Sequence, residues 1–205
     1  MIWPLLLSAT GAAGSVQFPD SNLSDCVEAA VQRAGLASAT ELVSLNCNAQ
    51  AIEDSTGINQ LVNLRTLSLF GNKLQHVDVR NLKALETLNL ANNRLREIDL
   101  SSNQTLKTLY LFGNQLEMLD LAETPVLVKL KAEKNRLKAV SFGLIPTLAK
   151  VYLFDNKMEN IKIDNLSGLT FIDVRSNPMP DEVYDYLDAF DGVKASHDGN
   201  TEDWE

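Results

Sequence analysis

Residues 106–114 read LKTLYLFGN, and this nine-residue pattern decides the fold of the chain. Copies with the same apolar spacing and a final Asn begin at residues 64, 85, 127, 148 and 169, so successive copies are 21 residues apart. A more divergent copy, LVSLNCNAQ, begins at Leu42, 22 residues before the next one. A fixed period of this length predicts an array of stacked repeats.

The spacing L-x-x-L-x-L-x-x-N is the signature of a leucine-rich repeat. It predicts an α/β solenoid, namely a right-handed leucine-rich-repeat horseshoe with short parallel β-strands on its concave face and helical caps at both ends. We expect Leu106, Leu109 and Leu111 to point into the core together with their counterparts in every turn. The Asn that ends each copy is expected to hydrogen-bond backbone groups left unpaired by the bend. This column comprises Asn72, Asn93, Asn114, Asn135, Asn156 and Asn177.

We divide the chain into four parts, which are a signal-like segment at residues 1–15, an N-terminal helical cap at 18–41, seven leucine-rich repeats at 42–179, and a C-terminal helical cap with an acidic tail at 180–205. The first part holds a short apolar run followed by small residues, which is typical of a signal peptide, although it lacks a basic start. That run is too short to span a bilayer. A disordered leftover is the alternative for this segment.

Helical caps are predicted on both sides of the repeats. In the first, Ser21 or Ser24 is the expected N-cap, the apolar residues that follow have helical spacing, and Gly35 is the expected stop. In the second, Asp181 is the expected cap and Gly192 the expected end. We expect residues 194–205, which are polar and acidic, to be frayed.

The two stretches FPDSNLSDCVEAAV (residues 18–31) and GINQLVNL (57–64) resemble the capping region of bacterial internalin-type leucine-rich-repeat proteins. This resemblance implies a secreted recognition module. The chain departs from the family in its short 21-residue repeats. The resemblance therefore leaves anchoring and the partner open.

Cys26 and Cys47 are the only cysteines. Cys26 belongs to the predicted cap helix and Cys47 fills the third leucine position of the first repeat, so a helix laid over that strand could bring the sulfurs together. An exported chain with an even number of cysteines favours a disulfide. The alternative is a pair of buried free thiols. Two thiols without a cluster of His or Asp do not predict a metal site.

Composition excludes several classes of function. A net charge of −9 argues against nucleic-acid binding, and nine of the acidic residues lie in residues 181–205 against one lysine. The two histidines, His76 and His197, are not expected to share a site, and no catalytic triad or phosphate-binding loop is present. We therefore expect no enzyme, no cofactor and no transmembrane span. A column of Asp78, Asp99 and Asp120 is interpreted as a solvated face rather than a Ca²⁺ site.

The remaining positions of the repeat face outward from the strands, and several of them carry aromatic and lysine residues. Exposed aromatic rings beside cations are typical of protein-binding hot spots. The lysines in this region are Lys107, Lys129, Lys131, Lys134 and Lys150. The candidate ligand-binding residues on the concave face are Phe70, Tyr110, Phe112, Lys129, Lys131, Lys150, Tyr152, Phe154 and Phe171. The alternative for Phe70, Phe112 and Phe154 is simple packing under the next turn.

The sequence thus predicts a secreted, periplasmic or cell-surface module that binds a protein as a monomer. Because lysines surround the aromatic rings, we expect that partner to have an acidic surface. A glycan or anionic-polymer binder, and a structural cell-envelope protein, are the alternatives.

Overall fold

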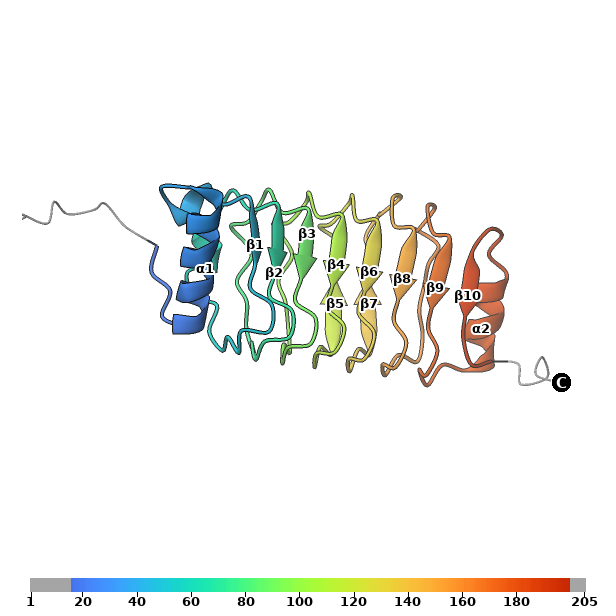
Figure 1. Ribbon diagram of the computed structural model, residues 1–205. Coiled ribbons are helices and arrows are strands. Elements are labelled where there is room, and N and C mark those ends of the chain that lie inside the picture. Colours follow the sequence, from blue (N-terminus) through green and yellow to red (C-terminus); the bar gives the residue numbers. More distant parts are fainter. Residues whose placement is uncertain (1–15, 200–205) are drawn as a thin grey trace, which may run out of the picture.

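The computed structural model describes residues 16–199, so the signal-like segment predicted at residues 1–15 lies outside the described residues. The described chain is a solenoid in which each repeat forms one turn stacked on its neighbours (Figure 1). This confirms the predicted leucine-rich-repeat fold, while the four-part division of the chain stays a prediction.

The strands of the main sheet are three residues long and parallel. Within residues 16–199 the sheet has eight strands, in the spatial order β1 (Ser44–Asn46), β2 (Thr66–Ser68), β3 (Thr87–Asn89), β4 (Thr108–Tyr110), β6 (Lys129–Lys131), β8 (Lys150–Tyr152), β9 (Phe171–Asp173) and β10 (Lys194–Ser196). The register is fixed by the repeat, so that Leu109 pairs with Leu88 on one side and with Leu130 on the other. Equivalent repeat positions therefore form straight columns along the solenoid.

A second, smaller sheet lies on the other side of the turns. In the described chain it consists of β5 (Met118–Asp120) and β7 (Ala139–Ser141), which pair in parallel. The core lies between the two sides. Leu106, Leu109 and Leu111 have no exposed surface, and Leu119 from the opposite half of the same turn is 3% exposed. The inward orientation predicted for the repeat leucines is confirmed.

The asparagine column forms the predicted hydrogen bonds. Asn114 Oδ1 accepts from the backbone N–H of Leu95 at 3.0 Å. Its Nδ2 donates to the carbonyls of Leu90 at 3.0 Å and Leu111 at 2.9 Å. One side chain thereby joins its own bend to the preceding turn, which is why the position requires an amide.

The N-terminal cap contains α1 (Ser21–Ala34) and a short 3₁₀ helix, η1 (Ala39–Glu41). A second 3₁₀ helix, η2 (Ile58–Gln60), follows β1 within the repeats. The expectation that Ser21 or Ser24 caps α1 is wrong, because Asp20 is the N-cap and its Oδ1 accepts from the N–H of Leu23 at 3.1 Å. Gly35 ends the helix in the left-handed conformation at φ 65°, as predicted.

The predicted disulfide is confirmed. Cys26 of α1 is bonded to Cys47, which directly follows β1, and their Cα atoms are 5.9 Å apart. The alternative of two buried free thiols is therefore wrong. The bond attaches α1 to the first turn of the repeats, as Figure 1 shows for the helix and β1.

The C-terminal end differs from expectation in three ways. The expectation that Asp181 caps the last helix is wrong, because Pro180 is the N-cap of α2 (Asp181–Asp188) and Asp181 is its first residue. The helix closes at Ala189, earlier than the predicted Gly192. The expectation that residues 194–205 are frayed is wrong for β10, which pairs with β9 in register, Ala195 opposite Ile172. The pairing occurs because β9 offers a free row of backbone groups that the next segment of chain can satisfy.

Candidate binding site on the concave face

The nine candidate residues lie on or directly after the strands of the main sheet. Tyr110 lies in β4, Lys129 and Lys131 in β6, Lys150 and Tyr152 in β8, and Phe171 in β9. Each of the remaining three residues lies two positions after the end of a strand, Phe70 after β2, Phe112 after β4 and Phe154 after β8. All are half-buried except Lys150, which is exposed. We call these nine residues the concave patch.

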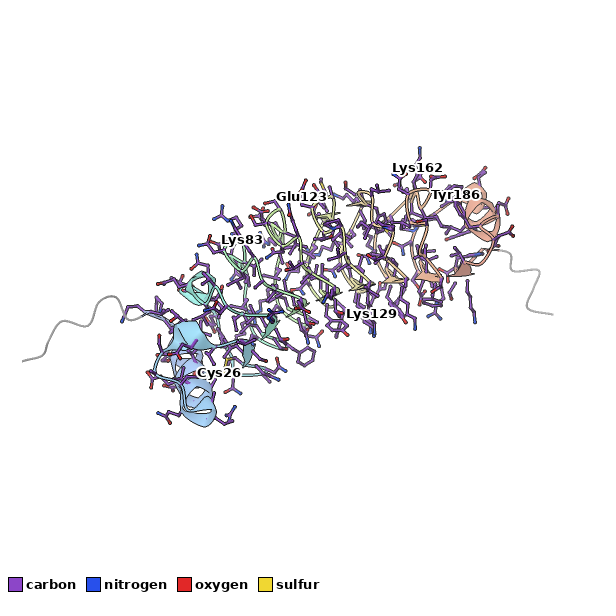
Figure 2. All side chains as sticks on the ribbon, turned by 90° about the horizontal axis from the view of Figure 1, so that it is seen from above. Cys26, Lys83, Glu123, Lys129, Lys162 and Tyr186 are labelled. Atoms are coloured by element: carbon purple, nitrogen blue, oxygen red, sulfur yellow. A yellow bond between two sulfur atoms is a disulfide. The ribbon has the colours of Figure 1, made fainter. Side chains whose placement is uncertain are left out.

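The middle of the concave patch is held together by contacts between rings and cations. Lys129 Nζ lies 5.6 Å from the ring centroid of Tyr110, and Lys131 Nζ lies 4.9 Å from that of Tyr152. The rings of Tyr152 and Phe171 are 5.2 Å apart. These contacts bring five of the nine residues together on neighbouring strands, and their role in binding stays a prediction. Figure 2 shows Lys129 on one long side of the solenoid and Lys83, Glu123 and Lys162 on the opposite side.

The phenyl rings after the strands have a partly structural environment. The rings of Phe70 and Phe112 are 6.2 Å apart although they lie two turns apart, and Ala91, the residue between them in the column, is fully buried. A small residue there lets the two rings meet above it. Both interpretations of these phenyl groups, packing and binding, thus have support in the geometry.

The lysines of the concave patch lack acidic partners. Elsewhere lysines pair with a glutamate one turn back, as in Lys73–Glu53 at 2.8 Å, Lys107–Glu86 at 2.7 Å and Lys138–Glu117 at 2.9 Å.

By contrast, within residues 16–199 no ion pair is formed by Lys129, Lys131 or Lys150. Lys129 and Lys150 are register partners on adjacent strands, and like charges placed directly opposite each other are destabilising. Within the described residues, these three lysines therefore carry positive charge without a direct ion pair, although Lys131 interacts electrostatically with Glu133.

Glu133 is a residue of this face whose position sequence reasoning missed. It occupies the column between Phe112 and Phe154 and was expected to face outward, but it is only 7% exposed. Its Oε2 is buried and, within the described chain, has no hydrogen-bond partner. Burial raises the pKa of its carboxyl above the ordinary value. The available signal was one acidic residue in a column of mostly apolar ones.

Two charged residues at the end of β9, Asp173 and Arg175, were not among the candidate residues. Asp173 is 3% exposed, and its carboxylate oxygens accept from Arg175 Nε at 2.9 Å and Nη2 at 2.7 Å. This pairing raises the pKa of Arg175. The guanidinium carbon also lies 5.9 Å from the ring centroid of Phe154. Arg175 is thus neutralised locally, in contrast to the patch lysines.

The acidic column of Asp78, Asp99 and Asp120 lies on the other side of the turns. Its carboxylates accept hydrogen bonds from groups two residues further along the chain. Asp78 accepts from Arg80 Nε at 3.0 Å, and this hydrogen bond lowers the pKa of Asp78 to about 2. Asp99 accepts from the N–H of Ser101 at 2.9 Å. A groove of about 640 Å³ includes Asp78 and Asp99 in its lining. In the part of the chain that the structure describes, no group of three or more potential ligands could hold a metal ion.

Residues 18–135 match the family model of the leucine-rich-repeat domain of EndoS, an endo-β-N-acetylglucosaminidase. The match covers more than half of the chain and includes the N-terminal cap and the repeats up to Asn135. No curated protein matches the chain.

Several solved structures from Listeria monocytogenes are similar. An internalin, InlF, has 20% sequence identity and a TM-score of 0.61, over 89% of this chain and 63% of InlF. Internalin C2 has 19% identity and a TM-score of 0.60, over 88% of this chain and 94% of that structure. The functional domain of InlJ has 21% identity and a TM-score of 0.47, over 79% of this chain and 51% of that domain. The chain therefore spans less than two thirds of InlF and of the InlJ domain, and the likeness to InlF and internalin C2 shows an internalin-like fold.

Proposed function

Because the chain belongs to the family of the EndoS leucine-rich-repeat domain and has an internalin-like solenoid fold, we propose that it is a secreted or cell-surface recognition module. In this proposal it is not an enzyme, and it binds a protein with an acidic surface through the concave patch. The observation that carries the proposal is that Lys129 and Lys131 lie against aromatic rings and form no ion pair within the described residues.

The chemistry of the concave patch suits a protein partner. Half-buried aromatic rings present apolar area that a partner can cover without large loss of side-chain entropy. The unpaired ammonium groups attract carboxylates and raise the rate of encounter. Lys129 and Lys150 repel each other in the free protein, so a carboxylate placed between them would relieve that repulsion.

An extracellular location fits the disulfide between Cys26 and Cys47, since such bonds persist in oxidising compartments. No helix of residues 16–199 is long and apolar enough to cross a membrane. We propose that the chain acts there as a monomer, with one concave patch per binding event.

The test is binding by a variant in which Tyr110, Lys131 and Tyr152 are changed to Ala. Partners are captured from envelope and host extracts with the wild-type chain, and their affinity is then measured for the variant. We expect a loss of about 2 kcal/mol or more in binding, with folding nearly unchanged because these side chains lie outside the core.

The matched control changes Lys83, Glu123 and Lys162 to Ala, three exposed residues on the opposite side of the solenoid (Figure 2). This control is expected to bind like the wild type. A partner that binds the concave variant as tightly as the wild type would refute the proposal. Capture of a glycan in place of a protein would refute the assignment of partner class.

A further inference from the structure

The centre of the concave patch contains a negative charge that the sequence pattern does not require. Glu133 follows Lys131 by two residues and stands between Phe112 and Phe154 in its column. The equivalent position carries Phe in three other turns and Ala in one, with Asn48 in the first turn and Arg175 in the last, so the fold tolerates an apolar residue there. Glu133 instead places a carboxyl group in this column and is 7% exposed.

This carboxylate is poorly compensated. In the described chain its Oε2 has no hydrogen-bond partner, and Glu133 forms no ion pair although Lys131 and Lys134 flank it in sequence. Burial is the largest influence on the pKa of Glu133 and raises it. A hydrogen bond from the backbone of Glu133 itself and the charges of Lys131 and Lys134 act to lower this pKa, and Asp173 acts to raise it. A buried carboxylate without its full set of partners is destabilising for the fold. Its presence in a recognition surface therefore points to a role in binding.

We propose that Glu133 is a specificity-determining residue of the concave patch, which excludes partner carboxylates from its centre and selects an uncharged polar residue there. This inference rests on the proposed binding of an acidic protein. In this proposal Lys129 and Lys150, at the start of β6 and β8, donate hydrogen bonds to partner carboxylates, and Lys134, whose Nζ lies 5.9 Å from the ring centroid of Phe154, donates to them after the end of β6. Between these lysines the buried charge of Glu133 repels a third carboxylate.

The physical basis is the weak screening of a buried charge. Glu133 lies beside aromatic rings, where water is largely excluded and the effective dielectric constant is lower than in solution. A partner carboxylate placed over it would approach a like charge without water between them, which costs several kcal/mol in complexes. A hydroxyl or amide in the same place carries no such penalty. The concave patch thus favours acidic segments interrupted by uncharged polar residues over uniformly acidic ones.

The experiment compares two synthetic peptides of equal length, poly-Glu and alternating Glu-Ser, with the full chain at about pH 8, where a carboxyl group is normally ionised. The wild type is expected to bind the alternating peptide at least as tightly as poly-Glu, despite its lower charge. In Glu133→Gln we expect poly-Glu to bind roughly tenfold more tightly and the alternating peptide to change little, so that the preference reverses.

The matched control is Glu123→Gln, which removes the same charge from an exposed position on the opposite side (Figure 2). It is expected to leave the ratio of the two affinities unchanged. Circular dichroism and thermal unfolding verify that both variants are folded.

An equal gain for both peptides in Glu133→Gln would overturn the inference, because it would show a general charge effect without selection at the centre. If peptide binding is lost in the Tyr110, Lys131 and Tyr152 variant but the affinity ratio does not respond to Glu133→Gln, only this inference fails. If the wild type binds neither peptide, the proposed acidic partner fails together with it.

Discussion

At the scale of single residues, the asparagine column makes each turn depend on the one before it. Asn114 bonds the backbone of Leu90, Leu95 and Leu111, and it is 8% exposed. In Asn114→Ala these three buried backbone groups lose their partner, so we expect the free energy of unfolding to fall by roughly 2–5 kcal/mol. Urea denaturation measures the change. Asn160→Ala, at an exposed position, should alter stability by no more than about 0.5 kcal/mol.

Glu133 should have the opposite effect on stability. Its pKa is raised in the folded state, so the folded protein binds that proton more tightly than the unfolded chain does. The free energy of unfolding therefore falls as pH rises from the ordinary pKa of a glutamate toward the raised pKa in the folded protein. Above both pKa values the burial of the charged carboxylate destabilises the fold in full. Glu133→Gln should melt at a higher temperature than the wild type at about pH 8, and the difference should vanish at about pH 4. A variant that is less stable than the wild type at the higher pH would contradict this.

The repeat pattern was enough to predict that the leucines are buried and that the asparagines bond the backbone. Each of these residues recurs in register, so stacking of the turns gives every copy the same surroundings. It was not enough for Glu133. Its neighbours in the column are Phe112 and Phe154, and how far Glu133 is buried depends on side-chain packing rather than on spacing. Sequence reasoning likewise grouped Lys107 with the patch lysines, but Glu86 on the preceding turn pairs with it.

At the scale of elements, Asp20 links helix α1 to the repeats. One carboxylate oxygen caps the helix at Leu23, and the other accepts from the N–H groups of Glu53 at 2.8 Å and Asp54 at 3.1 Å. Partial burial acts to raise the pKa of Asp20, but the hydrogen bonds from these residues prevail and lower it.

We expect Asp20→Ala to reduce the free energy of unfolding by about 1–3 kcal/mol, measured by urea denaturation near neutral pH. Asp20→Asn should lose less, because its side-chain oxygen can still cap the helix. Because the pKa of Asp20 is lowered in the folded protein, its charged carboxylate stabilises the fold at any pH above the ordinary pKa of an aspartate. This stabilisation disappears as pH falls through the lowered pKa. The gap between wild type and Asp20→Asn should therefore narrow in acid. Equal stability of all three proteins at neutral pH would show that Asp20 does not join the two elements.

The ends of the elements were the least predictable part of the fold. Ser21 and Ser24 are good N-cap residues by type, but Asp20 precedes them and can reach both the helix and the loop at Glu53, which spacing within the helix does not reveal. The strand β10 contains no leucine signature. It forms because β9 leaves an edge unpaired and because the ring of His197 stacks on Tyr184 of α2 at 4.6 Å. The pairing with β9 and the stacking on α2 both involve residues outside β10, so the local sequence of this strand does not predict them.

At the scale of the whole molecule, the charge is distributed unevenly over the solenoid. The chain carries a net charge of −9, yet Lys129, Lys131 and Lys150 of the concave patch form no ion pair within residues 16–199. Exposed charges farther apart than about 10 Å are largely screened at 0.1 M salt, so an acidic partner near the patch experiences mainly the local lysines. The columns that form the patch could be predicted from the repeat, since stacking places equivalent positions side by side. Which lysines lack a partner could not, because that depends on glutamates in neighbouring turns.

The solenoid also requires a cover for its first turn. Leu23 and Val27 of α1 are at most 1% exposed and pack against the core that includes Leu45 of β1. A repeat array gains its stability from interfaces between neighbouring turns, so loss of the cap should act first on the turn it covers. We expect a chain that starts at residue 42, with Cys47→Ser, to aggregate or to lose amide protection in β1 and β2 while β8 and β9 keep theirs. Native-state hydrogen exchange measures this gradient.

The control for the truncated chain is the full chain with Cys26→Ser and Cys47→Ser, which lacks the disulfide but keeps α1. By loop-closure entropy this protein should lose about 3 kcal/mol of stability relative to the wild type and remain a folded monomer. The difference between the two proteins then isolates the packing of α1 on the first turn from the effect of the covalent bond. If the truncated chain stays monomeric, melts at the temperature of the control and protects β1 as well as β8, then α1 does not stabilise the repeats and the capping role assigned to it is wrong.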